Sequence, residues 1–480
     1  MQNSRRVRFT GILGAGASMV LGTAGMLVSS ALFAAEACTP AGCTPTSPTC
    51  QQCDQVFSDA AEKLKNLNPG CCPAPACAAP SACADVCNPD AVFNAGCNGG
   101  CGGKSNGELG DPWTLQSLFA NPCKPDKGWQ IGGWTSFGYR NNPDGSFAGN
   151  AQVLDDRQEW DRFALDQQYF YIGKTANGND GVGFGFRMDM IYGLDGNEAQ
   201  SFGNNPGEFD FLNGWDHGSY EWAMPQLYGE VAVGNHTAKI GHFYTLLGYE
   251  VIPATGNFFS SRQLTFYNSE PFTHTGVLVA SKVSDRLTLH NGWVLGMDTG
   301  FDQLGGGNAY HGGFIFQATE ATSLTYMAVF GDLGWRGNGA INSVVMSHQW
   351  TDRIQTVHQF DVFSSDLELA KPLGPFGFLQ ADVPANFAID GIARNSIGLI
   401  NYAFYEFNDR LKAGVRQEWY KADSVSYYTL TYGVNVKPHA NVIVRPEVRH
   451  MWSPGNDLVY GDGEDLYNQT VFGVDAIVTY

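Results

Sequence analysis

Short segments in which apolar and polar residues alternate recur along the chain from about residue 129 onward. The clearest of them runs from Val182 to Tyr192. Every second residue in it is large and apolar or aromatic, while the positions between are glycine, arginine, aspartate or isoleucine. Successive side chains of a β-strand point to opposite faces, so such a segment predicts a strand with one apolar face. The fold class predicted for this region is therefore all-β.

The alternating segments can be counted. They cover roughly residues 129–139, 163–175, 182–192, 219–233, 236–247, 274–284, 286–298, 310–319, 322–331, 341–351, 353–363, 394–407, 409–421, 427–436, 442–449 and 470–480, with a doubtful one at 376–381. Most have about the length of ~9–11 residues that crosses a bilayer as a strand. Because single-chain bacterial barrels favour even strand numbers, we predict about sixteen strands, with fourteen and eighteen as alternatives.

The links between the segments are of two kinds, which is typical of membrane barrels. Some are very short, such as 284–285 and 321–322, and read as periplasmic turns. Others are long and polar and read as external loops. The long links are 140–161, 193–218, 248–273 and 453–465.

Alternation alone does not separate a membrane barrel from a soluble sandwich, because both have one apolar strand face. Three other features favour the barrel: signs of export, tryptophans that recur near strand ends, and a long run of strands without a linker. The last segment, from Thr470 to Tyr480, ends on an aromatic residue and resembles the closing strand of an outer-membrane barrel. We therefore predict a single transmembrane antiparallel barrel over residues 124–480.

The N-terminus predicts a signal peptide over residues 1–37. Three arginines precede a weakly apolar stretch from Gly11 to Ala35, and Ala35-Glu36-Ala37 fits a small-x-small cleavage site. An uncleaved anchor helix is the alternative, since the stretch exceeds the usual apolar region of ~7–15 residues.

Cysteine usage marks a second boundary, because all 12 cysteines lie in residues 38–123. They are Cys38, Cys43, Cys50, Cys53, Cys71, Cys72, Cys77, Cys83, Cys87, Cys97, Cys101 and Cys123. An even number in an exported, Pro- and Gly-rich segment favours disulfides in the periplasm. The Cys50-x-x-Cys53 spacing keeps metal binding open as an alternative. The segment is expected to be irregular and to contact other parts of the cell envelope.

One block of the sequence resembles a known family. It runs from Leu227 to Thr299 and includes Lys239-Ile240-Gly241-His242-Phe243-Tyr244 and Ser269-Glu270-Pro271-Phe272. These residues resemble the OmpL-like β-barrel porins of Gram-negative outer membranes. The resemblance implies a barrel that lets small hydrophilic solutes diffuse passively, with outer-membrane lipid around it and no catalytic residues. By analogy of fold, it also implies a homotrimer.

Charged residues opposite the apolar strand faces are candidates for the pore lining. They are Arg187, Asp189, Glu230, Lys412, Arg416, Glu418, Arg445, Glu447 and Arg449. Basic and acidic groups facing each other across a lumen would sort solutes by charge. The alternative is that they pair with one another in the wall and have little effect on transport.

The long link from Tyr249 to Thr275 is unusually apolar for a free external loop. We predict that it folds into the lumen as a constriction loop, with Asn257, Arg262 and Glu270 as its candidate residues. A structured outer loop is the alternative.

Other functions find little support in the sequence. A formal charge of -19 is unsuited to binding nucleic acid, which needs clustered Lys and Arg. The metalloprotease signature His-Glu-x-x-His does not occur, and we predict no enzyme activity, no cofactor and no metal site. The alternative to a porin is a structural outer-membrane protein whose Cys-rich segment tethers or crosslinks the envelope, with little or no open pore.

Overall fold

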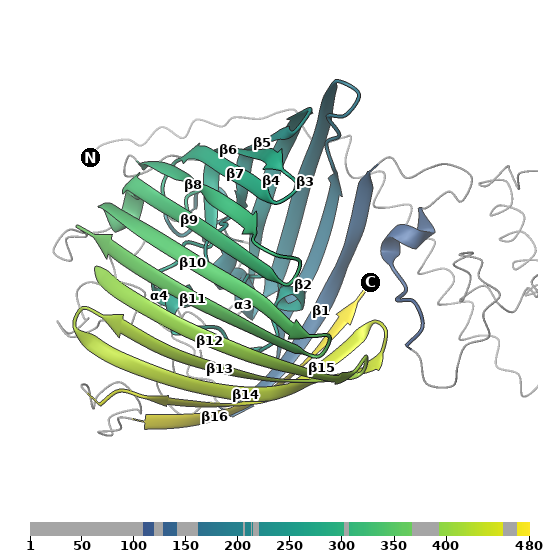
Figure 1. The fold of residues 1–480 in the computed structure, drawn as a ribbon, viewed down its shortest axis with the longest axis vertical. Helices are drawn as coiled ribbons and strands as arrows, with labels where there is room; N and C mark the ends of the chain where they lie inside the picture. Colours follow the sequence, from purple (N-terminus) through teal and green to yellow (C-terminus); the bar gives the residue numbers. More distant parts are fainter. Residues whose placement is uncertain are drawn as a thin grey trace, which may run out of the picture. The chain divides into compact units, whose positions relative to one another are not determined.

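The computed structural model describes residues 109–119, 128–141, 162–204, 207–212, 214, 220–301, 307–366, 393–454 and 468–480. Three expectations therefore lie outside the described residues: the signal peptide, the cysteines with their disulfides or metal, and the doubtful strand at 376–381. The described chain is almost entirely β (Figure 1).

Sixteen antiparallel strands form the fold, as the alternation predicted. Their bounds are β1 (Trp129–Asn141), β2 (Arg162–Lys174), β3 (Val182–Gly193), β4 (Glu221–Val233), β5 (His236–Tyr244), β6 (Thr273–Ser284), β7 (Leu287–Val294), β8 (Asn308–Gln317), β9 (Thr322–Asp332), β10 (Asn338–Thr351), β11 (Ile354–Ser365), β12 (Asn395–Asn408), β13 (Leu411–Ala422), β14 (Val425–His439), β15 (Val442–Trp452) and β16 (Asn468–Thr479). Every strand pairs with its neighbours in the sequence.

The sheet closes because the last strand pairs with the first. In the β1–β16 ladder Ser136 lies opposite Ile477, and Gly138 lies opposite Asp475. A closed sheet satisfies all its backbone hydrogen bonds internally, which a strand structure must do in hydrocarbon. The predicted all-β barrel is confirmed.

The polarity of the wall is that of a membrane barrel. On β13, Val415 is 43% exposed on the outer face, while its neighbour Arg416 is 0% exposed and points inward. On β16, Phe472 points out and Asp475 points in. Apolar side chains thus face outward and charged ones face the interior, whereas a soluble sandwich would bury its apolar face.

The two ends of the barrel differ. At one end the links are short, such as 234–235 between β4 and β5 and 409–410 between β12 and β13. At the other end most links are longer, although 423–424 alone joins β13 to β14, and the longest described link, 245–272, joins β5 to β6. We call these the turn end and the loop end.

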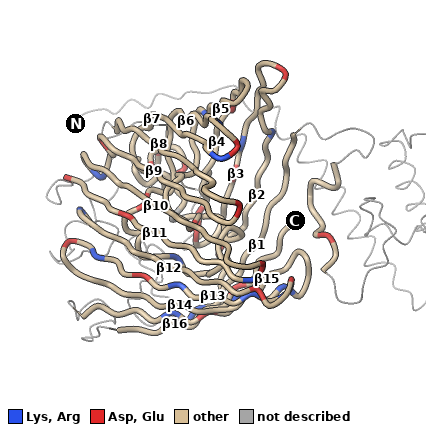
Figure 2. The backbone as a smooth tube through the Cα atoms, viewed as in Figure 1, with Lys and Arg blue, Asp and Glu red and all other residues tan. Residues whose placement is uncertain are grey.

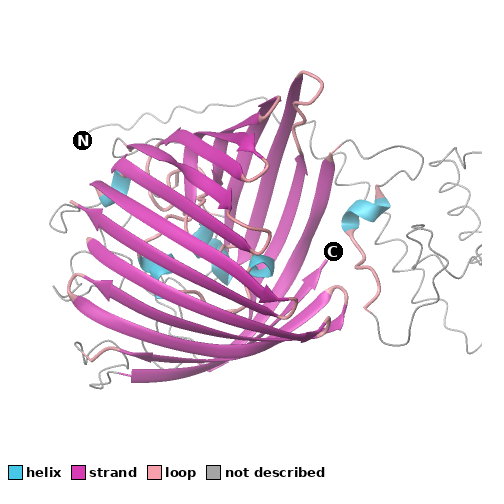
Figure 3. Ribbon diagram, in the orientation of Figure 1, coloured by secondary structure: helices cyan, strands magenta, loops and turns pink. Residues whose placement is uncertain are grey.

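Helices are few and short in the part of the chain that the structure describes (Figure 3). They are η2 (Leu115–Leu118), α3 (Leu194–Ala199), η3 (Ala254–Gly256), α4 (Leu264–Asn268) and η4 (Gly334–Arg336). Among the residues with a described structure, no helix is long and apolar enough to cross a membrane.

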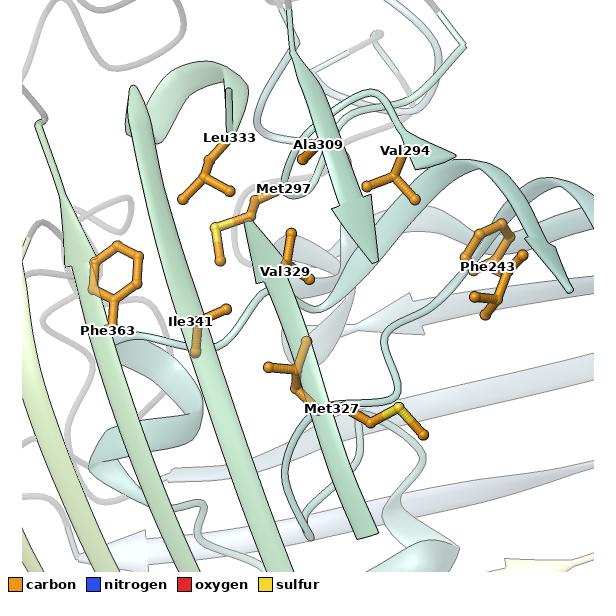
Figure 4. Packing of buried hydrophobic residues seen from close by; sticks show 11 residues of the cluster. Phe243, Val294, Met297, Ala309, Met327, Val329, Leu333, Ile341 and Phe363 are labelled. Atoms are coloured by element: carbon orange, nitrogen blue, oxygen red, sulfur yellow. The ribbon is translucent and has the colours of Figure 1, made fainter. Parts of the chain in front are cut away.

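The interior is not polar throughout. Figure 4 shows an apolar cluster in which Val294, Val329, Ile341 and Phe363 from neighbouring strands pack together with Met297 from a loop. All five are almost fully buried. The cluster fills the space between the wall and the links of the loop end, so these links are held on the barrel by burial of apolar surface.

Candidate functional site

The link at 245–272 enters the barrel and packs on its inner wall; we call it the inner segment. It contains η3 and α4, and most of its residues from Phe259 to Phe272 are buried. Its polar groups are bonded to inward-facing side chains of strands far away in the sequence. The contacts described next explain why it stays inside.

Glu418 on β13 is the first anchor. Its carboxylate accepts hydrogen bonds from the backbone N–H groups of Leu264 and Thr265, at 2.9 and 2.8 Å, and from the Thr265 hydroxyl at 2.8 Å. The acceptor is therefore placed at the start of α4, where backbone N–H groups lack partners within the helix. A negative charge at this point satisfies them, and charge-assisted hydrogen bonds are stronger than neutral ones.

Arg416, one inward position away, is the second anchor. Its guanidinium donates to the Ser261 carbonyl at 2.8 Å and to the Ser261 hydroxyl at 2.9 Å, and it forms an ion pair with Glu250. Glu250 also accepts from the hydroxyl of Tyr402 at 2.9 Å and from the backbone N–H of Gln263 at 2.7 Å. The buried ion pair thus has the additional hydrogen bonds that a buried pair needs.

The strands β15, β16 and β2 hold the middle of the segment. Glu447 accepts from the backbone N–H groups of Ser260 and Ser261, at 2.8 and 3.1 Å. Arg445 donates to the carbonyls of Ala254 and Asn257, at 2.9 and 2.7 Å, and its Nε donates to Asp475 at 2.8 Å. On β2, the Gln167 side chain bonds to both the carbonyl of Ile252 and the N–H of Ala254.

Two glycines on the wall make room for the segment. A Cβ atom at Gly414 would lie 2.6 Å from the ring of Phe258, and one at Gly398 would lie 2.3 Å from the Thr265 hydroxyl. Both distances are far below normal van der Waals contact. The absence of a side chain at these inward positions therefore lets the segment approach the wall.

The charged residues expected to line the pore fall into two groups. Arg416, Glu418, Arg445, Glu447 and Arg449 face inward but are buried under the inner segment, so the basic ladder expected on β13 and β15 is not exposed to water there. Acidic and basic positions lie side by side on these strands (Figure 2). Arg445 forms an ion pair with Asp475 on β16, within the wall, whereas Arg416 forms one with Glu250 of the inner segment. Four of the five bond to the inner segment, whereas Arg449 has no hydrogen-bond partner among the described residues.

The other four candidates are Arg187 and Asp189 on β3, Glu230 on β4 and Lys412 on β13. Arg187 on β3 pairs with Asp189 and lies over the Tyr171 ring, with 4.1 Å from its guanidinium carbon to the ring centroid. Glu230 on β4 lies opposite Lys239 on β5, and both are partly exposed. Lys412 on β13, near the turn end, is also partly exposed, and its ammonium lies 5.0 Å from the Phe404 ring centroid.

The three candidates on the inner segment have internal or buried contacts. Arg262 is buried and donates to the carbonyls of Ile252 and Ser260, at 3.0 and 3.1 Å. The side chain of Asn257 bonds to the backbone of Val251 and Pro253. Glu270 is buried and accepts from Gln359 at 2.6 Å. These residues shape the segment from within, and neither Arg262 nor Glu270 is exposed to the lumen.

Sequence reasoning missed Glu250, Gln167 and Tyr402. Glu250 lies at the start of the apolar block, and its partner Arg416 is 166 residues away. Alternation signalled only that Tyr402 is part of a strand. No local pattern could have paired these residues, because closure of the barrel brings them together.

Three carboxyl groups outside the strands have raised pKa values. Burial raises the pKa of Asp298 to about 7, although its carboxylate accepts from the N–H groups of Phe272 and Thr273. Burial also raises the pKa of Glu270 well above its usual value, and nearby Asp361 adds to the effect. For Asp195, burial and the neighbouring Asp166 raise the pKa to about 6. Because these pKa values are raised in the folded protein, protonation of the three groups stabilises the folded arrangement around them.

Comparison with known proteins assigns the family. The model of the family described as "Putative beta-barrel porin-2, OmpL-like" matches residues 128–480, which is the whole barrel. The chain belongs to this family. The resemblance found in the sequence is thereby confirmed, and the protein is a β-barrel porin of the outer membrane.

Solved structures resemble this porin in fold alone. The outer membrane channel DcaP of Acinetobacter baumannii is 10% identical, with a TM-score of 0.48 over 73% of this chain and 97% of that chain. A mutant of the Rh. blastica porin is 14% identical, with a TM-score of 0.46 over 73% of this chain and 100% of that chain. No curated protein matches the porin in sequence.

Proposed function

We propose that the inner segment is the constriction of this porin and that solutes pass between the segment and the wall formed by β3 to β9. The observation that carries the proposal is the uneven distribution of the side-chain hydrogen bonds that hold the middle of the segment. The described side chains that anchor its middle lie on β1, β2, β10 to β13 and β15. The passage then follows the remaining wall.

The chemistry of that wall favours small polar solutes. Arg187, Glu230 and Lys239 face inward there and are partly exposed. The cationic groups of Arg187 and Lys239 lie over the Tyr171 and Tyr228 rings, and the acidic Glu230 lies opposite Lys239. Fixed charges and dipoles along a narrow aqueous passage select solutes by charge and by hydrogen bonding.

Single-channel conductance of the full chain in planar bilayers tests the function. We expect discrete ohmic steps. Absence of conductance from correctly folded protein would favour the structural role with a closed interior instead.

A pair of tryptophan variants tests the position of the constriction. Val251 on the inner segment is 40% exposed, and Val233 on the outer face of β4 is 50% exposed. Val251→Trp should lower the conductance because it enlarges an exposed part of the segment, while Val233→Trp should leave it unchanged. Equal conductance in both variants would contradict the proposed constriction.

We also propose that the turn end faces the periplasm, because short turns lie on that side in outer-membrane barrels. The chain before β1 is bound at this end: the side chain of Asn441, in the β14–β15 turn, bonds to both the N–H and the carbonyl of Trp113. The Cys-rich segment 38–123 would then lie in the periplasm, where envelope contacts and disulfides are available to it. Protease accessibility of this segment in intact and in permeabilised cells checks the orientation.

A homotrimer remains a proposal by analogy with sixteen-stranded diffusion porins. Light scattering of the purified porin in detergent, corrected for bound detergent, measures the number of chains.

A further inference from the structure

We propose that residues 113–119, just before the barrel, form an anchor that lies in the interface of the periplasmic leaflet and contacts phospholipid. These residues include η2 and present several large apolar side chains to the outside. Trp113 is 47% exposed, Leu118 is 65% exposed and Phe119 is 69% exposed. Such a concentration of exposed apolar groups on a short segment marks an interaction surface.

Hydrogen bonds hold this segment against the barrel rim. The backbone of Trp113 is bound on both sides by the Asn441 side chain, at 2.9 Å from its N–H and 2.6 Å to its carbonyl. The same Asn441 amide donates to the carbonyl of Thr479 at 2.9 Å, so it connects the segment to the end of β16. The Gln116 side chain donates to the carbonyl of Trp129 at 2.9 Å. Figure 3 shows the short helix next to the barrel.

The position of these bonds identifies the partner. Trp129 is the first residue of β1, is 47% exposed, and packs edge-on against Phe186 of β3, whose side chain points outward. Both rings belong to the lipid-facing surface of the barrel at the turn end. Leu118 and Phe119 follow within three residues of Gln116, so the chain keeps both of them close to that lipid-facing surface.

The amino-acid composition of residues 113–119 suits the membrane–water interface and not the hydrocarbon core of the membrane. Thr114, Gln116 and Ser117 alternate with the apolar residues, and Asp111 is exposed just before them. Tryptophan and mixed apolar and polar side chains are typical of the region between headgroups and acyl chains. The depth of the anchor in the membrane is set by the rim of the barrel at the turn end, because the aromatic girdles of membrane barrels lie at their rims.

Photo-crosslinking to lipid tests the proposal with the full-length porin. The protein is reconstituted into phosphatidylcholine vesicles that carry a diazirine either near the glycerol or near the end of the acyl chain, and labelled peptides are mapped by mass spectrometry. We expect labels on 113–119 mainly from the shallow probe. The double variant Leu118→Ser with Phe119→Ser should lose these labels and keep the labels on the outer strand faces, which shows that the barrel is folded.

Two outcomes would overturn the proposal. One is labelling of the outer strand faces with no label on 113–119 from either probe. The other is protein-to-protein crosslinking of 113–119 to a second copy or to residues 38–108, with lipid labelling unchanged in the double variant. Trp113→Phe provides a matched variant that retains both backbone bonds to Asn441, so its labels at 118 and 119 should persist.

Discussion

Replacing Glu418 by alanine should release the start of α4 from the wall without opening the barrel. The wild-type carboxylate accepts three hydrogen bonds from Leu264 and Thr265. The variant leaves these donors without an acceptor in a buried site, while the backbone ladders of β13 to β12 and β14 stay intact. The perturbation is therefore local to the inner segment.

The magnitude follows from the kind of bond that is lost. A hydrogen bond to a charged group contributes about 1.5–3 kcal/mol, and the three share one carboxylate, so we expect a loss of about 3–5 kcal/mol in the free energy of local opening. Each 1.4 kcal/mol is a factor of ten in an equilibrium. The opening equilibrium at Leu264 and Thr265 should thus rise by about a hundredfold or more.

Hydrogen exchange followed by mass spectrometry measures this opening in the full-length protein. Peptides covering 259–270 should lose protection in Glu418→Ala, while peptides of β2 and β3 should not change. Glu418→Gln keeps one acceptor oxygen and should lie between the wild type and the alanine variant. Glu320→Ala, in an exposed turn, removes the same charge as a control.

Bilayer recordings supply the functional readout. The released segment should increase open-channel noise, since the lumen then contains a mobile element. A folded Glu418→Ala protein with unchanged exchange at 259–270 would refute the anchoring role of this carboxylate.

The remaining predictions concern the wall, the fit of the segment and pH. Val415→Arg, at the outer middle of β13, should destabilise the barrel in lipid by about 2–4 kcal/mol, whereas Val436→Arg near the rim should cost about 0–1 kcal/mol; urea-dependent folding in vesicles gives both values. Gly398→Val should push Thr265 off the wall and raise exchange across α4, because a Cβ there meets the Thr265 hydroxyl at 2.3 Å. The pKa of Asp298 is raised to about 7 in the folded state, so its contribution to stability is full below the unfolded pKa near ~4 and is lost as pH rises through about 7. The rate of amide hydrogen exchange in residues 270–273, corrected for its intrinsic pH dependence, should therefore increase from pH 5 to pH 8. The variant Asp298→Asn should show a smaller increase.

Sequence reasoning succeeded best where a local period carries the information. In β3 every second residue is apolar, and in β13 the same alternation runs from Leu411 to Trp419 with Gln417 as the exception; this pattern depends only on the geometry of a strand. Strand number followed from the same count, because each crossing repeats the pattern. The long apolar link after β5 was noticeable for the same reason: its composition is wrong for a loop in water.

The surroundings of the inward charges could not be deduced in this way. The alternation puts Arg416 and Glu418 on the face opposite Val415 but does not say whether water or protein covers that face. Their partners are Glu250 and the start of α4, more than 150 residues away. A buried and a solvated arginine look identical in a sequence.

The amino-acid sequence by itself determined that this protein consists of strands of membrane-spanning length with one apolar face. It could do so because the alternation that marks a strand is a property of neighbouring residues. Only the tertiary structure decided what the interior contains. Closure of β1 on β16 brings distant strands around one space, and in that space a carboxylate such as Glu418 meets backbone donors of the inner segment. The burial of the inward charges, their partners and the course of the passage all depend on these contacts between distant residues. The strength of an electrostatic contact is set by its three-dimensional surroundings.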